Sequence, residues 1–325
     1  MKRTVPHRAS RALALLFGLL LCRQAGAQGL ELLDVRQDGS DRLAVAAAPA
    51  ADPEIERLVE LARRTRGSKT EWTPGKPLAE GRNAHNTNTK EHMKEALERA
   101  WNFIEGDVRQ ELNPPHELEM RHDACHETGD NLTLRQWLAV GAASGRGLKL
   151  DVKEPQHVDR VIEEVVAAGV PEGRLMSNLG FDAMETWGSK IRARFPGVRL
   201  AINPPSGAGK LDASRVDAML AQGRRFGGPV TFVVRFDLLT AASLHALKTG
   251  GPVSVWNSPF EGPTVEDAAA VTRSLKERGV DGVVDIRQSK SLGDRVAGGI
   301  DRVKNQVRTN GEGLIRKVVG SIPGL

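Results

Sequence analysis

The sequence predicts an α/β protein whose main part is a (β/α)8 barrel of the TIM type, and three observations predict it. From residue 82 onward, short strand-like runs alternate with helical patterns of 10 to 15 residues, as in repeated βα units around a parallel sheet. Eight such runs occur, mostly 20 to 32 residues apart. No Gly-x-Gly-x-x-Gly follows the first run, which disfavours the alternative, a doubly wound open sheet.

The segment before the barrel, residues 28–71, is predicted to be a linker followed by one amphipathic helix. The linker ends in the Ala/Pro-rich stretch 46–51, which buries little surface. Asp52 is suited to the N-cap and Pro53 to the first helical position. The apolar stripe consists of Ile55, Leu58, Val59 and Ala62. We expect this helix to pack across one end of the barrel domain, residues 72–288.

The barrel elements are expected in regular alternation. The strands are expected at 82–86, 103–108, 147–152, 174–179, 198–203, 230–236, 253–257 and 282–286. The helices are expected at 89–100, 134–143, 157–168, 182–194, 213–224, 241–248 and 265–278. The long gap after the second strand holds a further strand-like piece, 117–123, which we expect to form a hairpin arm over the barrel mouth.

Residues 289–325, after the last strand, are predicted to be a helical tail. Their apolar positions recur at helical spacing between glycines, at Val296, Ile300, Val303 and Val307. We expect the tail to close the bottom or one side of the domain.

Residues 1–27 have the three parts of a secretory signal peptide: a basic stretch up to Arg11, an apolar run over 12–22 and a small-residue cleavage motif at 25–27. The apolar run is too short to span a bilayer of about 30 Å, so no stable membrane anchor is expected. The alternatives are a retained anchor and a lipid anchor on Cys22, which the bulky residues before it disfavour. The mature protein is predicted to be secreted or periplasmic.

The formal net charge of +5 disappears with the signal peptide. Residues 1–27 hold five basic side chains and no acidic one, so their removal leaves 41 basic against 41 acidic side chains. An even balance argues against broad nucleic-acid binding. Cys125 is then the only cysteine left, so no internal disulfide is expected and stability must come from a core.

Charged residues follow a period of two on two neighbouring predicted strands. Glu105 and Asp107 share one face of the second strand, and Lys149, Asp151 and Lys153 share one face of the third. The opposite, aliphatic faces pack under helices, so the charges point into the barrel. Buried charges cost several kcal/mol each unless they are paired or bind metal. Either lysine–carboxylate pairs fill the barrel, or the three carboxylates hold a divalent cation, for which oxygen ligands favour Mg²⁺, Ca²⁺ or Mn²⁺ over zinc.

Two histidines close strand-like segments beside this cluster. His85 ends the first strand and His122 ends the hairpin arm, which favours an acid/base pair over two structural histidines. A zinc site formed by His122, Cys125 and His126 is an alternative that lacks a second cysteine. No base is evident that would make Cys125 a nucleophile.

Later strands carry single polar residues at equivalent positions, namely Asn178, Asn203, Arg235, Trp256 and Asp285. Arg235, inside an apolar strand, would suit a bound anion or a salt bridge with Asp285. Trp256 would suit the core or a platform for a ligand.

The order of these motifs resembles the phosphodiesterase barrels of the glycerophosphodiesterase and sphingomyelinase D type, and more closely the menorin family. The resemblance covers about residues 72–287. The segments that carry it are His85-Asn86, Ile104 to Val108, His122, 132–138, 147–153, 233–235, 254–256 and Asp285-Ile286. The sequence departs from these families at Asn86, where glycerophosphodiesterases have Arg-Gly, and at Asp123-Ala124, where menorins tend to have Pro-Pro.

The resemblance implies a divalent cation at Glu105, Asp107 and Asp151, with His85 and His122 as the acid/base pair. It also implies that Lys153 contacts a phosphate. From their positions on the strands, we further expect substrate contacts from Lys149, Asn178, Arg235 and Trp256. The expected function is that of an exported, metal-dependent phosphodiesterase-like protein that hydrolyses or cyclises a small phosphodiester or a lipid head group.

Two other classes of function stay open at this point. A non-catalytic extracellular protein would use the same barrel to bind a ligand or a partner. A secreted glycosidase would use Glu105 with Asp151, but it leaves Lys149 and Lys153 on the same face without a role.

Overall fold

The structure, a computed structural model, describes residues 52–112, 114–122, 129–207, 209–258 and 263–288. The predicted signal peptide, the linker, Cys125, His126 and the predicted tail at 289–325 lie outside these residues. Within the described ranges, no helix combines the length and the apolar composition that a membrane span needs.

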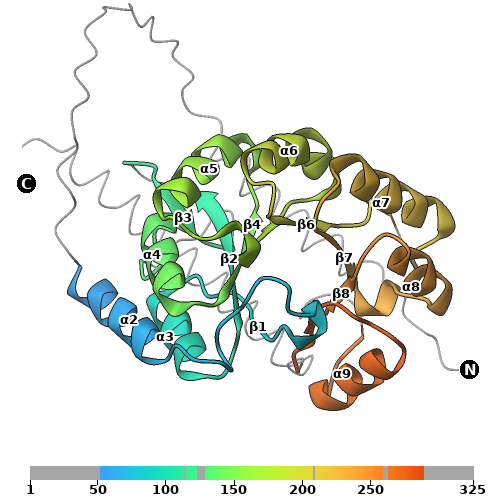
Figure 1. The fold of residues 1–325 in the computed structure, drawn as a ribbon, viewed down its shortest axis with the longest axis horizontal. Helices are drawn as coiled ribbons and strands as arrows, with labels where there is room; N and C mark the ends of the chain where they lie inside the picture. Colours follow the sequence, from blue (N-terminus) through green and yellow to red (C-terminus); the bar gives the residue numbers. More distant parts are fainter. Residues whose placement is uncertain (1–51, 113, 123–128, 208, 259–262, 289–325) are drawn as a thin grey trace, which may run out of the picture. The chain divides into compact units, whose positions relative to one another are not determined.

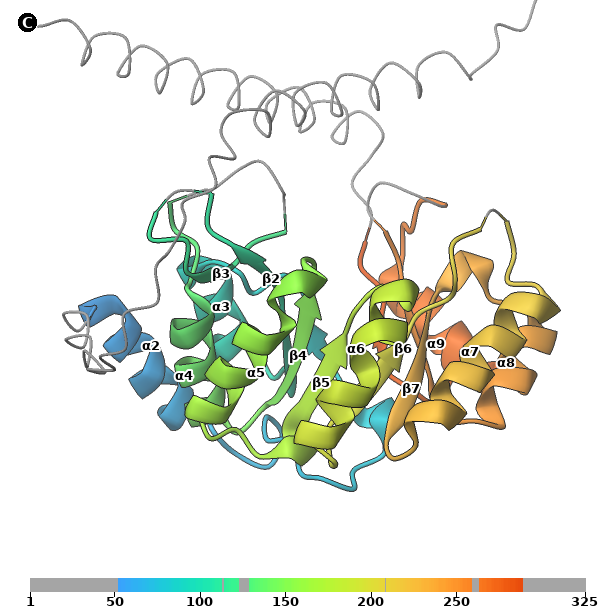
Figure 2. The same cartoon turned by 90° about the horizontal axis from the view of Figure 1, so that it is seen from above.

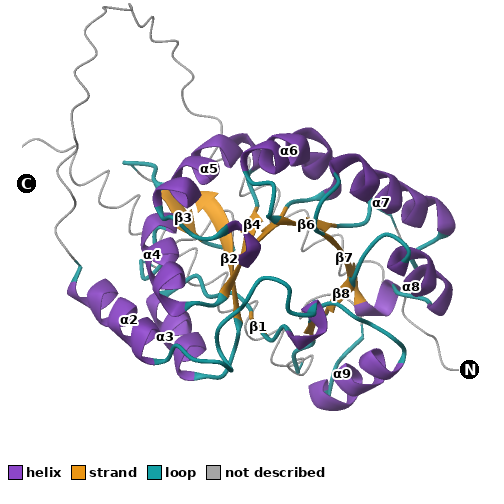
Figure 3. Ribbon diagram, viewed as in Figure 1, coloured by secondary structure: helices purple, strands orange, loops and turns teal. Residues whose placement is uncertain are grey.

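The core of the fold is a sheet of parallel strands that follow one another in chain order and curve into a barrel (Figures 1 and 3). The strands are β1 (Asn83–Ala84), β2 (Phe103–Gln110), β4 (Gly147–Val152), β5 (Leu175–Asn178), β6 (Arg199–Ile202), β7 (Val230–Arg235), β8 (Val253–Trp256) and β9 (Val284–Asp285). The predicted (β/α)8 barrel is confirmed. A doubly wound sheet is wrong, because that fold reverses its strand order at a switch point.

The two ends of the sheet meet through side chains. Within the described residues, no main-chain ladder joins β1 to β9. Instead, the Asn83 side-chain amide donates a hydrogen bond to Asp285 Oδ2 over 3.1 Å. This contact brings together residues from the first and the last strand, so that the barrel is nearly closed.

Helices cover the outside of the sheet (Figures 2 and 3). They are α2 (Pro53–Arg64), α3 (Lys90–Glu98), α4 (Leu134–Ser144), α5 (Val158–Ala167), α6 (Phe181–Arg194), α7 (Ala213–Phe226), α8 (Ala241–Lys248) and α9 (Ala268–Glu277). Several begin where a side chain accepts a hydrogen bond from the first turn. Thr133 and Gln136 form a capping box at α4, and Asp267 caps α9, so that α9 begins later than predicted.

The N-terminal helix α2 forms as predicted, with Asp52 as its N-cap and Pro53 in its first turn. Lys90 of α3 donates to Asp52 over 3.0 Å and to Glu54 over 3.1 Å. The helix packs on the side of the barrel, against α3 and α4 (Figure 1), and not across one end. Leu58 and Ala62 of its apolar stripe are buried in this packing.

The predicted arm is the short strand β3 (Leu118–Met120), which pairs antiparallel with the extended end of β2. Met120 lies opposite Val108. The main-chain amide of Arg121 donates to the carbonyl of Asp107 over 2.7 Å. The arm therefore holds the C-terminal end of β2, where the charged residues lie.

The interior of the barrel is apolar below the charged residues. One buried cluster combines Trp72, Leu78, Phe103, Met176, Ala201, Val233 and Val283. Phe103 lies two residues before Glu105 on the same face of β2, and the ring of Trp72 packs on it with the centroids 4.4 Å apart. The carboxylates and lysines therefore lie above this apolar cluster, toward the C-terminal ends of the strands, the barrel mouth.

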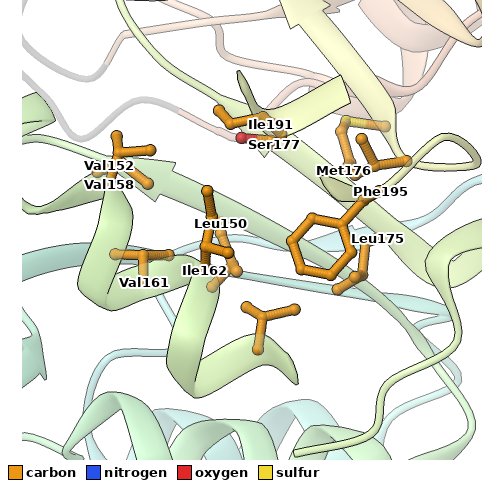
Figure 4. Close-up of a pocket in the computed structure, with 12 residues that line it drawn as sticks. Leu150, Val152, Val158, Val161, Ile162, Leu175, Met176, Ser177, Ile191 and Phe195 are labelled. Atoms are coloured by element: carbon orange, nitrogen blue, oxygen red, sulfur yellow. The ribbon is translucent and has the colours of Figure 1, made fainter. Parts of the chain in front are cut away.

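A small apolar cavity lies between helices α5 and α6 and strands β4 and β5 (Figure 4). Its free volume of about 30 Å³ is lined almost wholly by aliphatic and aromatic side chains.

We expect Val161→Ile to fill part of this cavity and to raise the free energy of unfolding by about 0.8 kcal/mol, the value of one buried methylene. Thermal unfolding measures the change. Val140→Ile is the control, since Val140 is fully buried on α4 and does not line the cavity. A melting temperature that falls equally in both variants contradicts the prediction.

Candidate functional site

The three carboxylates predicted as metal ligands come together at the mouth. Asp107 of β2 and Asp151 of β4 are register partners, and Glu105 precedes Asp107 by one inward position. One carboxylate oxygen from each lies within 4.8 Å of the others. Glu105 is fully buried and Asp107 is 1% exposed. The period of two on adjacent parallel strands produces this cluster directly.

Both lysines of β4 and its extension pair with these carboxylates. Lys153 Nζ lies 2.9 Å from Asp107 Oδ1 and 2.6 Å from Asp151 Oδ2, and Lys149 Nζ lies 3.6 Å from Glu105 Oε1. Burial disfavours the charged form of each lysine, but the surrounding carboxylates outweigh it, so the pKa of Lys149 and of Lys153 is raised above the ordinary 10.5. Both lysines stay cationic at neutral pH.

Two asparagines that sequence reasoning did not select hold the carboxylates in place. The main-chain amide of Asn86 donates to Glu105 Oε2 over 2.8 Å. The Asn88 side chain donates to Asp107 Oδ2 and accepts from the Asp107 amide, each over 2.9 Å. Asn86 has a φ of 60°, which turns its amide toward the barrel. The sequence signal for both is the Asn-x-Asn spacing directly after His85.

The glycine between the two β2 carboxylates makes room for this support. A Cβ on Gly106 would collide with Met120 and press on the side chains of Asn88 and Trp137. Trp137 Nε1 donates to Thr87 Oγ1 over 2.9 Å, and that hydroxyl donates to the carbonyl of Glu105 over 2.8 Å. Helix α4 thus reaches the site through Trp137 and Thr87.

The residues fit a divalent cation. Glu105 Oε1 is buried and accepts no hydrogen bond, although its residue is fully enclosed. Lys149 Nζ, at 3.6 Å, is too far away to donate to this oxygen, so a bound cation would stabilise it further. The three carboxylates supply the oxygen ligands that hard divalent ions prefer. Lys153 occupies the space between Asp107 and Asp151, so an ion must share these carboxylates with its ammonium group.

His85 lies inside the cluster. Its Nδ1 is 3.0 Å from Asp285 Oδ2 and 3.3 Å from Glu105 Oε2. Burial lowers the pKa of His85, but the Glu105 and Asp285 carboxylates outweigh burial, so the pKa lies above the ordinary 6.5. Burial by itself would raise the pKa of Asp285. The hydrogen bond and the charge of His85 outweigh this effect and hold the pKa of Asp285 well below the ordinary 3.8. Asp285, selected only as an isolated polar residue, is the partner that orients His85.

His122 lies at the rim, directly after β3. Its side chain is exposed, and its carbonyl accepts a hydrogen bond from Arg109 Nε over 3.1 Å. The main-chain amide of the preceding residue, Arg121, donates to the carbonyl of Asp107. His122 therefore directly follows a residue that contacts the backbone of the cluster. Its pairing with His85 in catalysis stays a prediction.

Two of the three remaining predicted substrate residues line a cavity of about 400 Å³ at the mouth. Arg235 and Trp256 line it, together with Asn203 and the first turn of α6. Asn178 does not line it but accepts a hydrogen bond from the Asn203 amide over 2.7 Å. Arg235 binds both carboxylate oxygens of Asp237, at 2.6 and 3.1 Å. The alternative salt bridge between Arg235 and Asp285 is therefore wrong, because Asp285 pairs with His85.

The fold and the site define a TIM-barrel protein with a candidate cation site of three carboxylates at the barrel mouth. Residues 78–172 match the profile of the Menorin N-terminal domain, which confirms the resemblance to the menorin family over that segment. The match includes β1, β2, β3 and β4, and with them the three carboxylates, both lysines and both histidines.

Solved structures with a similar arrangement are distant in sequence. One, from Galdieria sulphuraria, is assigned as a glycerophosphodiester phosphodiesterase; it has 16% identity and a TM-score of 0.49, and the match covers 65% of this chain and 95% of that one. Another, from Burkholderia cenocepacia, is assigned as a lyase or mutase, with 14% identity, a TM-score of 0.41 and coverage of 83% and 95%. The comparison with curated proteins gives no match.

Proposed function

We propose that the protein is an exported, metal-dependent phosphodiesterase that hydrolyses or cyclises a small phosphodiester or a lipid head group. The observation that carries the proposal is the buried Glu105 Oε1, which accepts no hydrogen bond and faces the Lys149 ammonium at 3.6 Å, among three carboxylates and beside a histidine held by a carboxylate. The menorin match over the same residues supports it.

Each side chain has a role in this proposal. Lys153 and Lys149 would donate to the non-bridging phosphate oxygens, because both remain cationic and reach the mouth. Nδ1 of His85 faces Asp285, so Nε2 is the nitrogen left to exchange a proton with the substrate. His122 would serve the opposite side of the phosphorus. A divalent cation held by Glu105, Asp107 and Asp151 would neutralise phosphate charge.

The cavity lined by Arg235 and Trp256 would receive one of the two ester groups. It adjoins the cluster, since Trp256 is the register partner of Asp285. Asp237 already neutralises Arg235, so a polar but uncharged group, or a group that displaces Asp237, would suit this position. This is why a phosphodiester with a bulky alcohol is a better substrate candidate than a phosphomonoester.

Turnover of a panel of phosphodiesters, in the presence of Mg²⁺, Ca²⁺ or Mn²⁺ and after chelation, tests the proposal. We expect release of an alcohol from a glycerophosphodiester, a lysophospholipid or an aryl phosphodiester, and loss of that release with a chelator. Thermal stabilisation by the same compounds without turnover would instead support the non-catalytic ligand-binding protein.

A further inference from the structure

Four arginines lie at the N-terminal end of the barrel, opposite the mouth, and form no ion pair with a carboxylate of the described residues. They are Arg146 after α4, Arg174 before β5, Arg192 in the last turn of α6 and Arg199 at the start of β6. Their guanidinium groups donate to main-chain carbonyls instead. Arg146 Nη1 and Arg192 Nε are buried and have no hydrogen-bond partner there. This end of the barrel therefore carries positive charge that its nearest neighbours do not neutralise.

The pKa values of these arginines reflect the missing counter-charge. Burial lowers the pKa of Arg146 and of Arg174 to about 10, and the charge of Arg66 adds to the effect at Arg174. Burial and the charge of Arg192 lower the pKa of Arg199. The guanidinium groups stay cationic at neutral pH. A bound anion would stabilise them, because it supplies the opposite charge in a poorly solvated place.

Two of these arginines, Arg174 and Arg199, line a cavity of about 130 Å³. The segment between α2 and β1 contributes Trp72, Pro74 and Lys76 to its lining. In Figure 2 this segment runs in blue below the strands, at the end opposite the mouth. The cavity has about four times the volume that one water molecule takes up in the liquid, so a tetrahedral oxyanion fits.

The cations around the cavity keep donors for a ligand. Only one of the five N–H groups of Arg199 donates to a described residue, to the carbonyl of Val230 over 2.8 Å. Lys76 Nζ donates to two main-chain carbonyls, over 3.5 and 3.1 Å, which leaves its third N–H. Arg174 is occupied by carbonyls at the end of α4 and therefore adds charge more than hydrogen bonds.

Two carboxylates lie near the cavity, but both have other partners. Glu71 pairs with Arg66. Glu172 Oε2 accepts a hydrogen bond from the main-chain amide of Gly197 over 2.6 Å. The charge of Glu71 acts against the lowering of the Arg174 pKa without cancelling it. The cavity thus keeps a surplus of positive charge.

We propose that this cavity binds a phosphate group, as the inorganic ion or as the end of a phosphomonoester. Such a group carries close to two negative charges at neutral pH, which matches several cations better than the single charge of a carboxylate. A guanidinium can bind two phosphate oxygens at once, and an ammonium can bind a third. Trp72, Pro74 and Met176 give the lining an apolar part that suits the carbon atoms of an ester.

This site is separate from the carboxylate cluster at the mouth. Phe103 and Met176 line the cavity and belong to the buried apolar cluster that fills the barrel below Glu105. The inference therefore goes beyond the proposed function and does not rest on it. Binding at this end can be measured without a substrate and without turnover.

Calorimetric titration of the chelator-treated full chain with inorganic phosphate tests the proposal. We expect saturable binding that Arg199→Met weakens at least about 10-fold, the value of one hydrogen bond to a charged group. Lys76→Met should weaken it to a similar degree and serves if Arg199→Met fails to fold. The matched control is Arg224→Met, since Arg224 is exposed in the last turn of α7 at the same end of the barrel. Equal affinity in Arg199→Met and Arg224→Met, or no binding to the unmodified protein, overturns the proposal.

A fourth variant, Lys153→Met, separates this cavity from the mouth, where lysines can also attract phosphate. We expect one binding event of unchanged affinity to remain in this variant. Complete loss of phosphate binding in Lys153→Met would place the ion at the mouth, which contradicts the second site and leaves the proposed function standing.

Hydrogen exchange of the unmodified chain locates the ion without any substitution. At a phosphate concentration of ten times Kd, we expect amide exchange in residues 71–77 and 196–200 to slow by up to about 10-fold, because the ligand stabilises the closed form. Slowing confined to residues 105–108 and 149–153 would rule out the site.

Glycerol 2-phosphate is titrated beside inorganic phosphate, because both present the same oxygens. Tighter binding of the ester would assign the cavity to a phosphomonoester, with its carbon atoms against Trp72 and Pro74. Tighter binding of the free ion would assign it to inorganic phosphate. If neither compound binds more weakly to Arg199→Met than to the unmodified protein, the assignment of the cavity is wrong.

Discussion

His85→Ala is expected to reduce phosphodiester turnover by about 10²- to 10⁴-fold, the usual contribution of a general acid or base. The side chain is oriented by Asp285 and adjoins Glu105, so its loss removes the proton-transfer group and leaves the carboxylates in place. His122→Ala is expected to have an effect of the same size, because the proposal gives the two histidines opposite roles. Steady-state rates on the best substrate of the phosphodiester panel measure both.

The matched control is His245→Ala. His245 lies exposed on α8, away from the carboxylate cluster, and its loss should leave turnover unchanged. Melting temperatures of all three variants separate lost chemistry from lost folding. If His85→Ala and His245→Ala turn over substrate equally well, the acid/base assignment of His85 is wrong.

Asp107→Asn is expected to weaken divalent cation binding by at least about 100-fold, beyond the 10- to 100-fold typical of substitutions outside the ligand shell. The substitution keeps the shape of the side chain but removes one of three charges. With Asp107 neutral, Lys153 pairs with Asp151 alone, and its ammonium group then competes more strongly with the ion for the Asp151 carboxylate. Calorimetric titration of chelator-treated protein with Mg²⁺, Ca²⁺ and Mn²⁺ measures the change without a substrate.

Asp182→Asn serves as the control for cation binding. Asp182 is an exposed carboxylate at the same mouth, in the wall of the cavity near Trp256, but it is not part of the triad. Its substitution should leave the affinity unchanged. Absence of binding to the unmodified protein would mean that Lys149 and Lys153 already neutralise the carboxylates, and the ligand-binding protein would become the better assignment.

The local pattern of the chain was enough to predict the charged lining. A strand alternates its side chains between two faces, so Glu105 with Asp107, and Asp151 with its two lysines, had to share a face. The apolar residues between them had to pack under helices. Parallel neighbours then bring the two charged faces together whatever the loops do, and the structure confirms it.

The partners of the same residues could not be predicted from spacing. His85 and Asp285 are 200 positions apart and meet only because the barrel brings β1 to β9. Asn88 reaches Asp107 because the chain turns at Asn86 and because Gly106 leaves space. Arg235 binds Asp237, two positions away, after the strand ends and the side chain turns back.

The sequence by itself determined the order of elements, the barrel and the inward direction of its carboxylates and lysines, because the periods of strands and helices are local properties. The tertiary structure alone decided which charges pair and which oxygen of Glu105 accepts no hydrogen bond. Those outcomes depend on distances between strands far apart in the chain, and the closure of the barrel sets these distances.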